Sequence, residues 1–280
     1  MKKNIKIFLL VILTAFISVI LTLYIVDNSD THSNYKVHEI DSIILSEKRE
    51  LIVKLPSDYK HSLDKDYSVI YVFGGNTLTY SIAYDTELLS RTNHLENVII
   101  VGIPNLNQKT RQRDLTPPFM KQDLDEPDSP LGKANKYLDF VQNEVIDLIE
   151  KTYRTTKTRI AVGHSREGLM VLNSLIYKTD LFQGHIALSP ALWRENNLFI
   201  DNFEKSISKS DTIKSYLFLS MGDKEVKKMK SSFNSIVEFL NTDIISKKVK
   251  WNSVYTKGAT HSNNALLSAP IGIETVLKNN

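Results

Sequence analysis

The chain has 280 residues, 42% hydrophobic and 24% charged, which is an ordinary balance for a globular protein with a sizeable core. Its 35 basic and 32 acidic residues leave a net charge of +3, which is too small and too scattered to indicate a nucleic-acid partner. Because the chain has no cysteine, disulfides, thiolate catalysis and zinc–thiolate sites are excluded.

The first thirty or so residues have the pattern of a membrane anchor. Residues 1–6 form a basic segment with three lysines, and Ile7 to Val26 then run for twenty residues without a charge. At about 1.5 Å per residue, such a run spans the roughly 30 Å hydrocarbon core of a bilayer. A cleavable signal has a shorter apolar region and a small-x-small site, which residues 24–27 do not offer. We expect a transmembrane signal anchor over 7–26, with the rest of the chain outside the cytoplasm; cleavage would instead give a secreted protein.

A polar link over 27–34 precedes what we expect to be one domain over 35–280. Two strand-like runs open this domain and predict an antiparallel hairpin. Six continuous apolar runs follow, of the kind that suits strands buried on both faces of a parallel sheet, at 68–73, 97–103, 159–163, 184–189, 215–220 and 250–255. Helical periodicity separates them, at 135–154, 169–178, 234–242 and 266–277. The alternation predicts an α/β fold with a mostly parallel sheet of about eight strands and helices on both faces.

Residues 104–133 are the longest stretch without such a pattern. They are rich in proline, charged and polar residues, and no apolar period runs through them. We expect an irregular insertion, and insertions of this length in a compact domain are usually functional or mobile loops.

The run 160–168, IAVGHSREG, joins an expected strand to an expected helix. Gly163 and Ser165 match Gly-x-Ser-x-Gly, the turn that presents a nucleophilic serine in α/β-hydrolases. Glu167 stands where the second glycine belongs, so we expect its side chain to point outward, or the backbone to shift with the support of Gly168. On that interpretation Glu167→Gly keeps or modestly raises activity. In the alternative interpretation, Ser165 only caps the helix.

A nucleophilic serine needs a base and an orienting acid, and in this fold the order is serine, acid, histidine. His261 lies in a polar loop after the last expected strand, whereas His185 lies inside a buried strand and is interpreted as a packing residue. Asp223 and Glu225 follow the strand that ends at Gly222. We expect Glu225 to be the acid, because its position and longer side chain suit this loop. Asp223 is the alternative, and both could instead be solvated loop charges.

The tetrahedral intermediate also needs two backbone N–H donors for its oxyanion. Arg166, directly after the serine, is expected to supply one of them. The run YVFGGN places a glycine turn after the strand at 68–73, so Gly75 or Asn76 is the expected second donor. A Gly–Gly pair is also common in ordinary tight turns.

Several segments, in this order, carry a family resemblance: VIIVGIPN, RQRDLTPP, IAVGHSREGL, GHIALSPALW, LFLSMGD and THSNNALLSAP. The chain from about residue 35 resembles the putative-esterase family of α/β-hydrolases, in the branch of enterochelin-type siderophore esterases and relatives of esterase D. The resemblance implies serine hydrolysis of esters without a metal or cofactor, with Ser165 and His261 carried over. Some members of this branch work as Ser–His pairs, which leaves the acid open.

The resemblance also implies that residues 111–118 lie beside the catalytic cleft. Arg113 is a candidate for binding an anionic group of the substrate, because guanidinium matches a carboxylate. A pair between Arg113 and Asp114 that braces the loop is the other interpretation. Trp193 is a candidate wall of the acyl pocket, or a residue that fills the core.

The expected function is a serine esterase for a small or siderophore-like ester, which forms an acyl-enzyme on Ser165 with His261 as base. Its expected partners are the ester and, through the N-terminal helix, the membrane. Two alternatives stay open. One is a catalytically degenerate α/β-hydrolase that binds or scaffolds, for which Glu167 is the main support; the other is an acyltransferase.

Overall fold

The computed structural model describes residue 6 and residues 11–22, 35–122 and 130–280, and the chain divides into a first unit that ends at Tyr35 and a second over Lys36–Asn280. In the first unit residues 11–22 are helical. The remainder of the expected 7–26 span and the 27–34 link lie outside the described residues. Within the described ranges, no helix is both long and apolar enough to cross a membrane. The transmembrane anchor stays a prediction.

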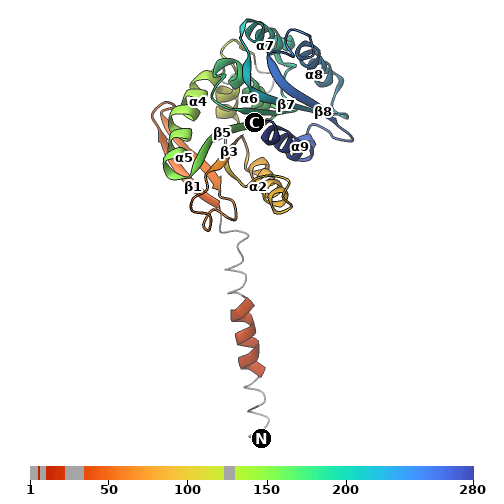
Figure 1. The fold of residues 1–280 in the computed structure, drawn as a ribbon. Helices are drawn as coiled ribbons and strands as arrows, with labels where there is room; N and C mark the ends of the chain where they lie inside the picture. Colours follow the sequence, from red (N-terminus) through yellow and green to blue (C-terminus); the bar gives the residue numbers. More distant parts are fainter. Residues whose placement is uncertain (1–5, 7–10, 23–34, 123–129) are drawn as a thin grey trace. The chain divides into compact units, whose positions relative to one another are not determined.

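The described part of the second unit is built on an eight-stranded sheet with the order β1-β2-β4-β3-β5-β6-β7-β8 (Figure 1). β2 pairs antiparallel with β4, and every pair from β4 across to β8 is parallel. This confirms the predicted sheet. The strands are β1 (Tyr35–Ser42), β2 (Glu47–Lys54), β3 (Tyr67–Phe73), β4 (Val98–Ile103), β5 (Thr155–His164), β6 (Gly184–Leu188), β7 (Ile213–Gly222) and β8 (Val249–Thr256).

Helices cover both faces of this sheet. α9 (Asn264–Lys278) packs closely on Ile186 and Phe218. A Cβ added at Gly272 of this helix would come within 2.9 Å of either side chain. The neighbouring strand residues Ala187 and Leu219 instead join the core cluster beneath α6. Because successive strand residues point to opposite faces, α9 and α6 lie on opposite sides. α2 (Asn76–Arg91) packs with α9 (Asn264–Lys278).

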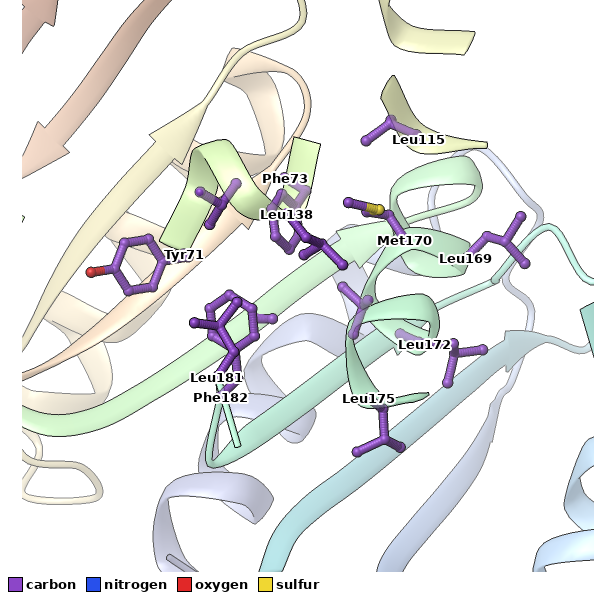
Figure 2. Packing of buried hydrophobic residues seen from close by; sticks show 14 of the residues in the cluster. Tyr71, Phe73, Leu115, Leu138, Leu169, Met170, Leu172, Leu175, Leu181 and Phe182 are labelled. Carbon is purple, nitrogen blue, oxygen red and sulfur yellow. The ribbon is translucent and has the colours of Figure 1, made fainter. Parts of the chain in front are cut away.

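The other face carries the remaining large helices and the main core. α6 packs on β5 and β6 and contacts α3, α4 and α7. Figure 2 shows part of this core cluster, to which leucines and a methionine of α6, aromatic residues of β3 and Phe182 contribute. The helices are α4 (Ala134–Phe140), which continues through the π-helical turn η1 (Val141–Ile146) into α5 (Asp147–Thr152), then α6 (Arg166–Tyr177), the 3₁₀ turn η2 (Arg194–Asn197), α7 (Leu198–Lys209) and α8 (Lys227–Leu240).

The stretch 104–133, expected to be irregular, contains the helix α3 (Gln108–Leu115). A capping box begins it: the Asn107 side chain accepts from the Thr110 N–H (3.0 Å), and Thr110 Oγ1 accepts from the Asn107 N–H (3.1 Å). The expectation was wrong because the residues that α3 buries include Gln112 and Asp114, so no apolar period marks the helix. Arg111 and Arg113 lie on this helix.

Candidate active site

Ser165 occupies a sharp turn between β5 and α6. Its φ of 60° and ψ of −113° lie where non-glycine residues rarely fall. The Ser165 N–H donates to the Leu188 carbonyl (2.9 Å), and the Ser165 carbonyl accepts from the N–H groups of Ala191 (2.9 Å) and Leu169 (3.0 Å). Such a strained backbone persists only where surrounding contacts hold it. Here the contacts come from the end of β6, from Ala191 shortly after it and from the first turn of α6.

The glycines around Ser165 allow this turn to form. A Cβ at Gly163 would lie 2.4 Å from the Glu167 carbonyl oxygen, so only glycine fits there. A Cβ at Gly168 would lie 3.1 Å from the Gly163 carbonyl oxygen and 3.2 Å from that of Leu188. Gly168 therefore does provide a close backbone contact, as expected.

His261 lies between Ser165 and Glu225. Its Nε2 is 3.0 Å from Ser165 Oγ, and its Nδ1 is 2.9 Å from Glu225 Oε2. Because an ionised carboxylate only accepts hydrogen bonds, Nδ1 carries the proton in the neutral ring and Nε2 is left to accept from the serine hydroxyl. This arrangement matches a nucleophile, a base and an orienting acid.

The second oxygen of Glu225 is held as firmly as the first. Oε1 accepts from Ser189 Oγ (2.5 Å) and from the Gly222 N–H (2.8 Å). Burial alone would raise the pKa of Glu225, but hydrogen bonds from His261, Ser189 and Gly222 outweigh it and leave the pKa below its usual value. The carboxyl group thus stays ionised, although only 5% of the residue is exposed.

Asp223, the alternative acid, has another partner. Its Oδ1 accepts from the Gly258 N–H (2.8 Å), in the turn after β8. Of the two acids that follow β7, Glu225 is the one that contacts the imidazole.

Buried polar residues that the sequence did not single out lie behind Glu225. Asn264 Nδ2 donates to Ser189 Oγ (2.8 Å) and to Ser220 Oγ (3.0 Å), and Ser268 Oγ lies 2.8 Å from Ser220 Oγ. All four are fully buried. Asn264 Oδ1 has no hydrogen-bond partner among the described residues, but the bonds made by Nδ2 and the serine hydroxyls restrict the side chains that they join, including Ser189, the partner of Glu225. The one available signal was the position of Ser189 directly after a buried strand.

Two aromatic side chains contact the His261 ring. The ring centroid of His164 is 4.6 Å away, and that of Trp193 is 6.0 Å away in an edge-on arrangement. Burial and the nearby His261 lower the pKa of His164 to about 4, so His164 adds no charge beside the imidazolium that forms in catalysis. Trp193 also packs against the main core, as in the core-filling interpretation, and its role as a wall of the acyl pocket stays a prediction.

The expected oxyanion donors lie at helix starts. Gly75 is the N-cap of α2, Asn76 is its first residue, and Arg166 is the first residue of α6. The first N–H groups of a helix have no acceptor within the helix and point toward the space before its start, where an anion can accept from them. The Gly74 N–H instead donates to the Ile103 carbonyl (3.1 Å), which leaves Gly75 and Asn76 as the candidate donors of this turn. A cleft of about 600 Å³ opens beside it, lined by Glu39, Lys48, Arg49, Glu50, Ile52, Gly75, Pro104, Asn105 and Leu106.

The expectation that Glu167 points outward was wrong. Only 6% of the residue is exposed, and its carboxylate accepts from Arg111 Nε (2.7 Å), Arg111 Nη2 (2.6 Å) and Asn105 Nδ2 (2.9 Å). Removal of this side chain would leave a cavity and strip Arg111 of its carboxylate, so Glu167→Gly is now expected to lower activity rather than preserve it.

Arg113 is bound by carboxylates. Its Nε donates to Asp114 Oδ1 (2.7 Å) and its Nη2 to Glu47 Oε1 (2.5 Å), and both acids also bind the buried Arg49. These contacts match the bracing interpretation, in which Arg113 and Asp114 attach α3 to β2.

Comparisons with known proteins point in one direction. A family model described as "Putative esterase" matches residues 42–256. Ferri-bacillibactin esterase BesA of Bacillus subtilis is 30% identical over 177 residues, which are 57% of this chain and 60% of that protein. Siderophore enterobactin esterase of Emericella nidulans is 29% identical over 201 residues, 63% of this chain and 65% of that protein. The matches thus span less than two thirds of these relatives.

The solved structure of an IroE-like serine hydrolase from Shewanella oneidensis has a TM-score of 0.80 and 26% identity, over 87% of this chain and 80% of that one. The family match covers most of the chain, and it includes the elements that carry Ser165 and Glu225. The chain belongs to the Putative esterase family and has the α/β-hydrolase fold.

Proposed function

We propose that this protein is a serine esterase that cleaves carboxylic esters through an acyl-enzyme on Ser165. The observation that carries the proposal is the continuous set of contacts from Ser165 Oγ through His261 to Glu225. Family membership supports the same reaction class.

In the first half of the reaction, Ser165 Oγ attacks the ester carbonyl carbon while its proton passes to His261 Nε2. The oxyanion that forms accepts hydrogen bonds from the backbone N–H of Arg166 and from the Gly75–Asn76 turn. Glu225 stabilises the imidazolium through its bond to Nδ1. His261 then returns the proton to the leaving alkoxide oxygen, the C–O bond of the ester breaks, and the alcohol departs.

In the second half, water replaces the alcohol. His261 Nε2 takes a proton from the water as it attacks the acyl carbon, and the same proton returns to Ser165 Oγ as the acid leaves. An acyltransferase would use a second alcohol at this step, and no contact in the described site favours one over water.

The catalytically degenerate alternative loses its main support. Glu167 does not disrupt the elbow. Ser165 has the strained φ of such a turn, and the Glu167 carboxylate accepts three hydrogen bonds from Asn105 and Arg111. A decayed site would have no need to keep Ser165, His261 and Glu225 within hydrogen-bond distance.

The proposed substrate class is a siderophore-like or other small ester. Two relatives are named as esterases of ferri-bacillibactin and of enterobactin. The cleft beside Gly75 is lined by neither Ser165 nor His261, so the proposed substrate class rests on the relatives. We also propose, from the sequence alone, that residues 7–26 anchor the enzyme in the cell membrane with its catalytic domain on the extracytoplasmic side.

Hydrolysis of p-nitrophenyl esters tests the reaction. Ser165→Ala and His261→Ala are each expected to lose most of kcat, and the double variant is expected to lose little more, because the two residues act as a unit. Clearly additive losses, or normal turnover by Ser165→Ala, would contradict the proposal.

A further inference from the structure

Glu167 joins three turns of the candidate site. Its backbone lies in the first turn of α6, two residues after Ser165. Its carboxylate binds Asn105 and Arg111, which follow β4, through three N–H donors at 2.6–2.9 Å. Its side chain also lies against Gly74, which follows β3: an added Cβ there would come 2.8 Å from Glu167 Cγ and 2.9 Å from Oε1. The turns after β3, β4 and β5 therefore meet on one carboxylate.

The charge of this carboxylate matters because of where it lies. Gly74 is adjacent to the candidate oxyanion donors Gly75 and Asn76, so an uncompensated negative charge there would repel the oxyanion of the transition state. Arg111 offers two N–H groups to the two carboxylate oxygens, the geometry of a strong ion pair. Arg111 thus places a compensating positive charge against the carboxylate, whereas Glu167 without Arg111 would oppose catalysis.

We propose that Glu167 and Arg111 form a positioning pair that holds the Gly74–Gly75 turn so that the N–H groups of Gly75 and Asn76 meet the oxyanion. On this view Glu167, which occupies the position of the second glycine of the elbow, is a functional residue. Both residues act through the backbone of the turn and need no contact with the substrate. The inference rests on the proposed esterase function.

Two single variants of the full-length protein separate the charge of Glu167 from its shape. Glu167→Gln keeps the size of the side chain but removes the charge and turns an amide N–H₂ toward donors. We expect kcat to fall about tenfold with KM within about twofold, because the oxyanion exists only in the transition state. Arg111→Met keeps the length of the side chain but leaves Glu167 without its guanidinium, so we expect a larger loss of kcat, about a hundredfold.

The double variant gives the sharpest expectation. Because Glu167→Gln removes the charge that Arg111→Met leaves uncompensated, the double variant should recover part of the kcat lost in Arg111→Met alone. Independent structural effects would instead multiply the two losses.

Glu150→Gln is the matched control. Glu150 also binds an arginine: it accepts from Arg159 Nε (2.8 Å), in the middle of β5, and from Lys157 (2.9 Å), near the start of that strand, whereas Ser165 follows its end. We expect its kcat and KM to equal those of the wild type. Thermal unfolding of every variant distinguishes loss of fold from loss of catalysis.

The readouts are kcat and KM for p-nitrophenyl acetate, with the folded fraction from circular dichroism. Wild-type kcat in Glu167→Gln, a multiplicative loss in the double variant, or a loss explained by the folded fraction would overturn the inference and leave the esterase function standing. If Arg111→Met does not fold, Glu167→Gln against Glu150→Gln decides. Absence of hydrolysis by the folded wild type would overturn the proposed function and the inference with it.

Discussion

Glu225 uses its two carboxylate oxygens for different tasks. Oε2 faces His261, and Oε1 is held by Ser189 and by the Gly222 N–H. Since the Gly222 N–H can only donate, an acceptor oxygen must remain on that side. The orientation of the carboxylate is thereby set by the backbone of the turn that follows β7, and the imidazole is oriented by the carboxylate.

This arrangement predicts the effect of Glu225→Gln. The amide oxygen would face Gly222, so the amide N–H₂ would face His261 Nδ1 and favour the tautomer protonated at Nε2, which cannot accept the serine proton. We expect kcat to fall by roughly a hundredfold or more with KM little changed. Asp223→Asn, whose oxygen can still accept from Gly258, is expected to keep near wild-type kcat. Steady-state kinetics would reverse the assignment if only the Asp223 variant lost turnover, and full activity in both would indicate a Ser–His pair.

Much of the candidate site could be predicted from the sequence, because its residues follow strands. Ser165 and Glu225 come shortly after the carboxyl ends of β5 and β7, and His261 follows the edge strand β8; these ends share one edge of a parallel sheet. The environment of Glu167 could not be predicted. Its partners Arg111 and Asn105 lie 56 and 62 residues earlier, in a stretch without apolar periodicity, so nothing local indicated that the side chain turns inward.

At the scale of elements, the buried strands were predictable because continuous apolar runs mark them. All six residues of β4 and all five of β6 are buried, and their bounds lie close to the expected ones. α2 was not among the predicted helices. Its large side chains Tyr80, Tyr84 and Leu88 are exposed, whereas smaller residues such as Thr79 and Ala83 are buried. A pattern of large apolar residues therefore points to the wrong face of that helix.

β6 carries a prediction of its own through His185, the expected packing residue. The ring is fully buried, and neither of its nitrogens has a hydrogen-bond partner among the described residues. Burial lowers the pKa of His185 to about 3. Between pH values near 3 and 6.5, the His185 imidazole binds a proton in the unfolded chain but not in the folded protein. The free energy of unfolding therefore rises with pH across this window.

His185→Leu should remove this dependence. Between pH 7 and pH 5 the free energy of unfolding of the wild type is expected to fall by about 2 kcal/mol more than that of the variant. Urea unfolding at the two pH values measures the difference, which does not depend on whether the leucine packs better or worse at pH 7. An equal pH dependence in both proteins would show that the buried imidazole is not the cause.

At the scale of the whole molecule, the topology brings the candidate site residues together. The parallel strands from β4 to β8 end at one edge of the sheet, where the turns after β3, β5 and β7 and the loop after β8 carry the proposed oxyanion donors, nucleophile, acid and base. The central core on the α6 face holds the nucleophile turn in place, because the first ten residues of α6 are all buried.

The N-terminal anchor is the whole-molecule property that rests on sequence alone. Fractionation of cells that express the native full-length protein is expected to place it in the membrane, and protease added from outside should reach the catalytic domain. The charge-free run over 7–26 is the reason for both expectations. A soluble form whose N-terminus begins near residue 27 would rule out the anchor and indicate a cleaved signal.

The central claim is that Ser165 is an activated nucleophile, and labelling by a fluorophosphonate followed by intact-mass and peptide analysis tests it most directly. We expect the folded wild type to gain one phosphonyl group on the peptide that contains Ser165, His261→Ala to react far more slowly, and Ser165→Ala to gain none. A folded wild-type protein that stays unlabelled, or a Ser165→Ala variant labelled at the wild-type rate, would contradict the account.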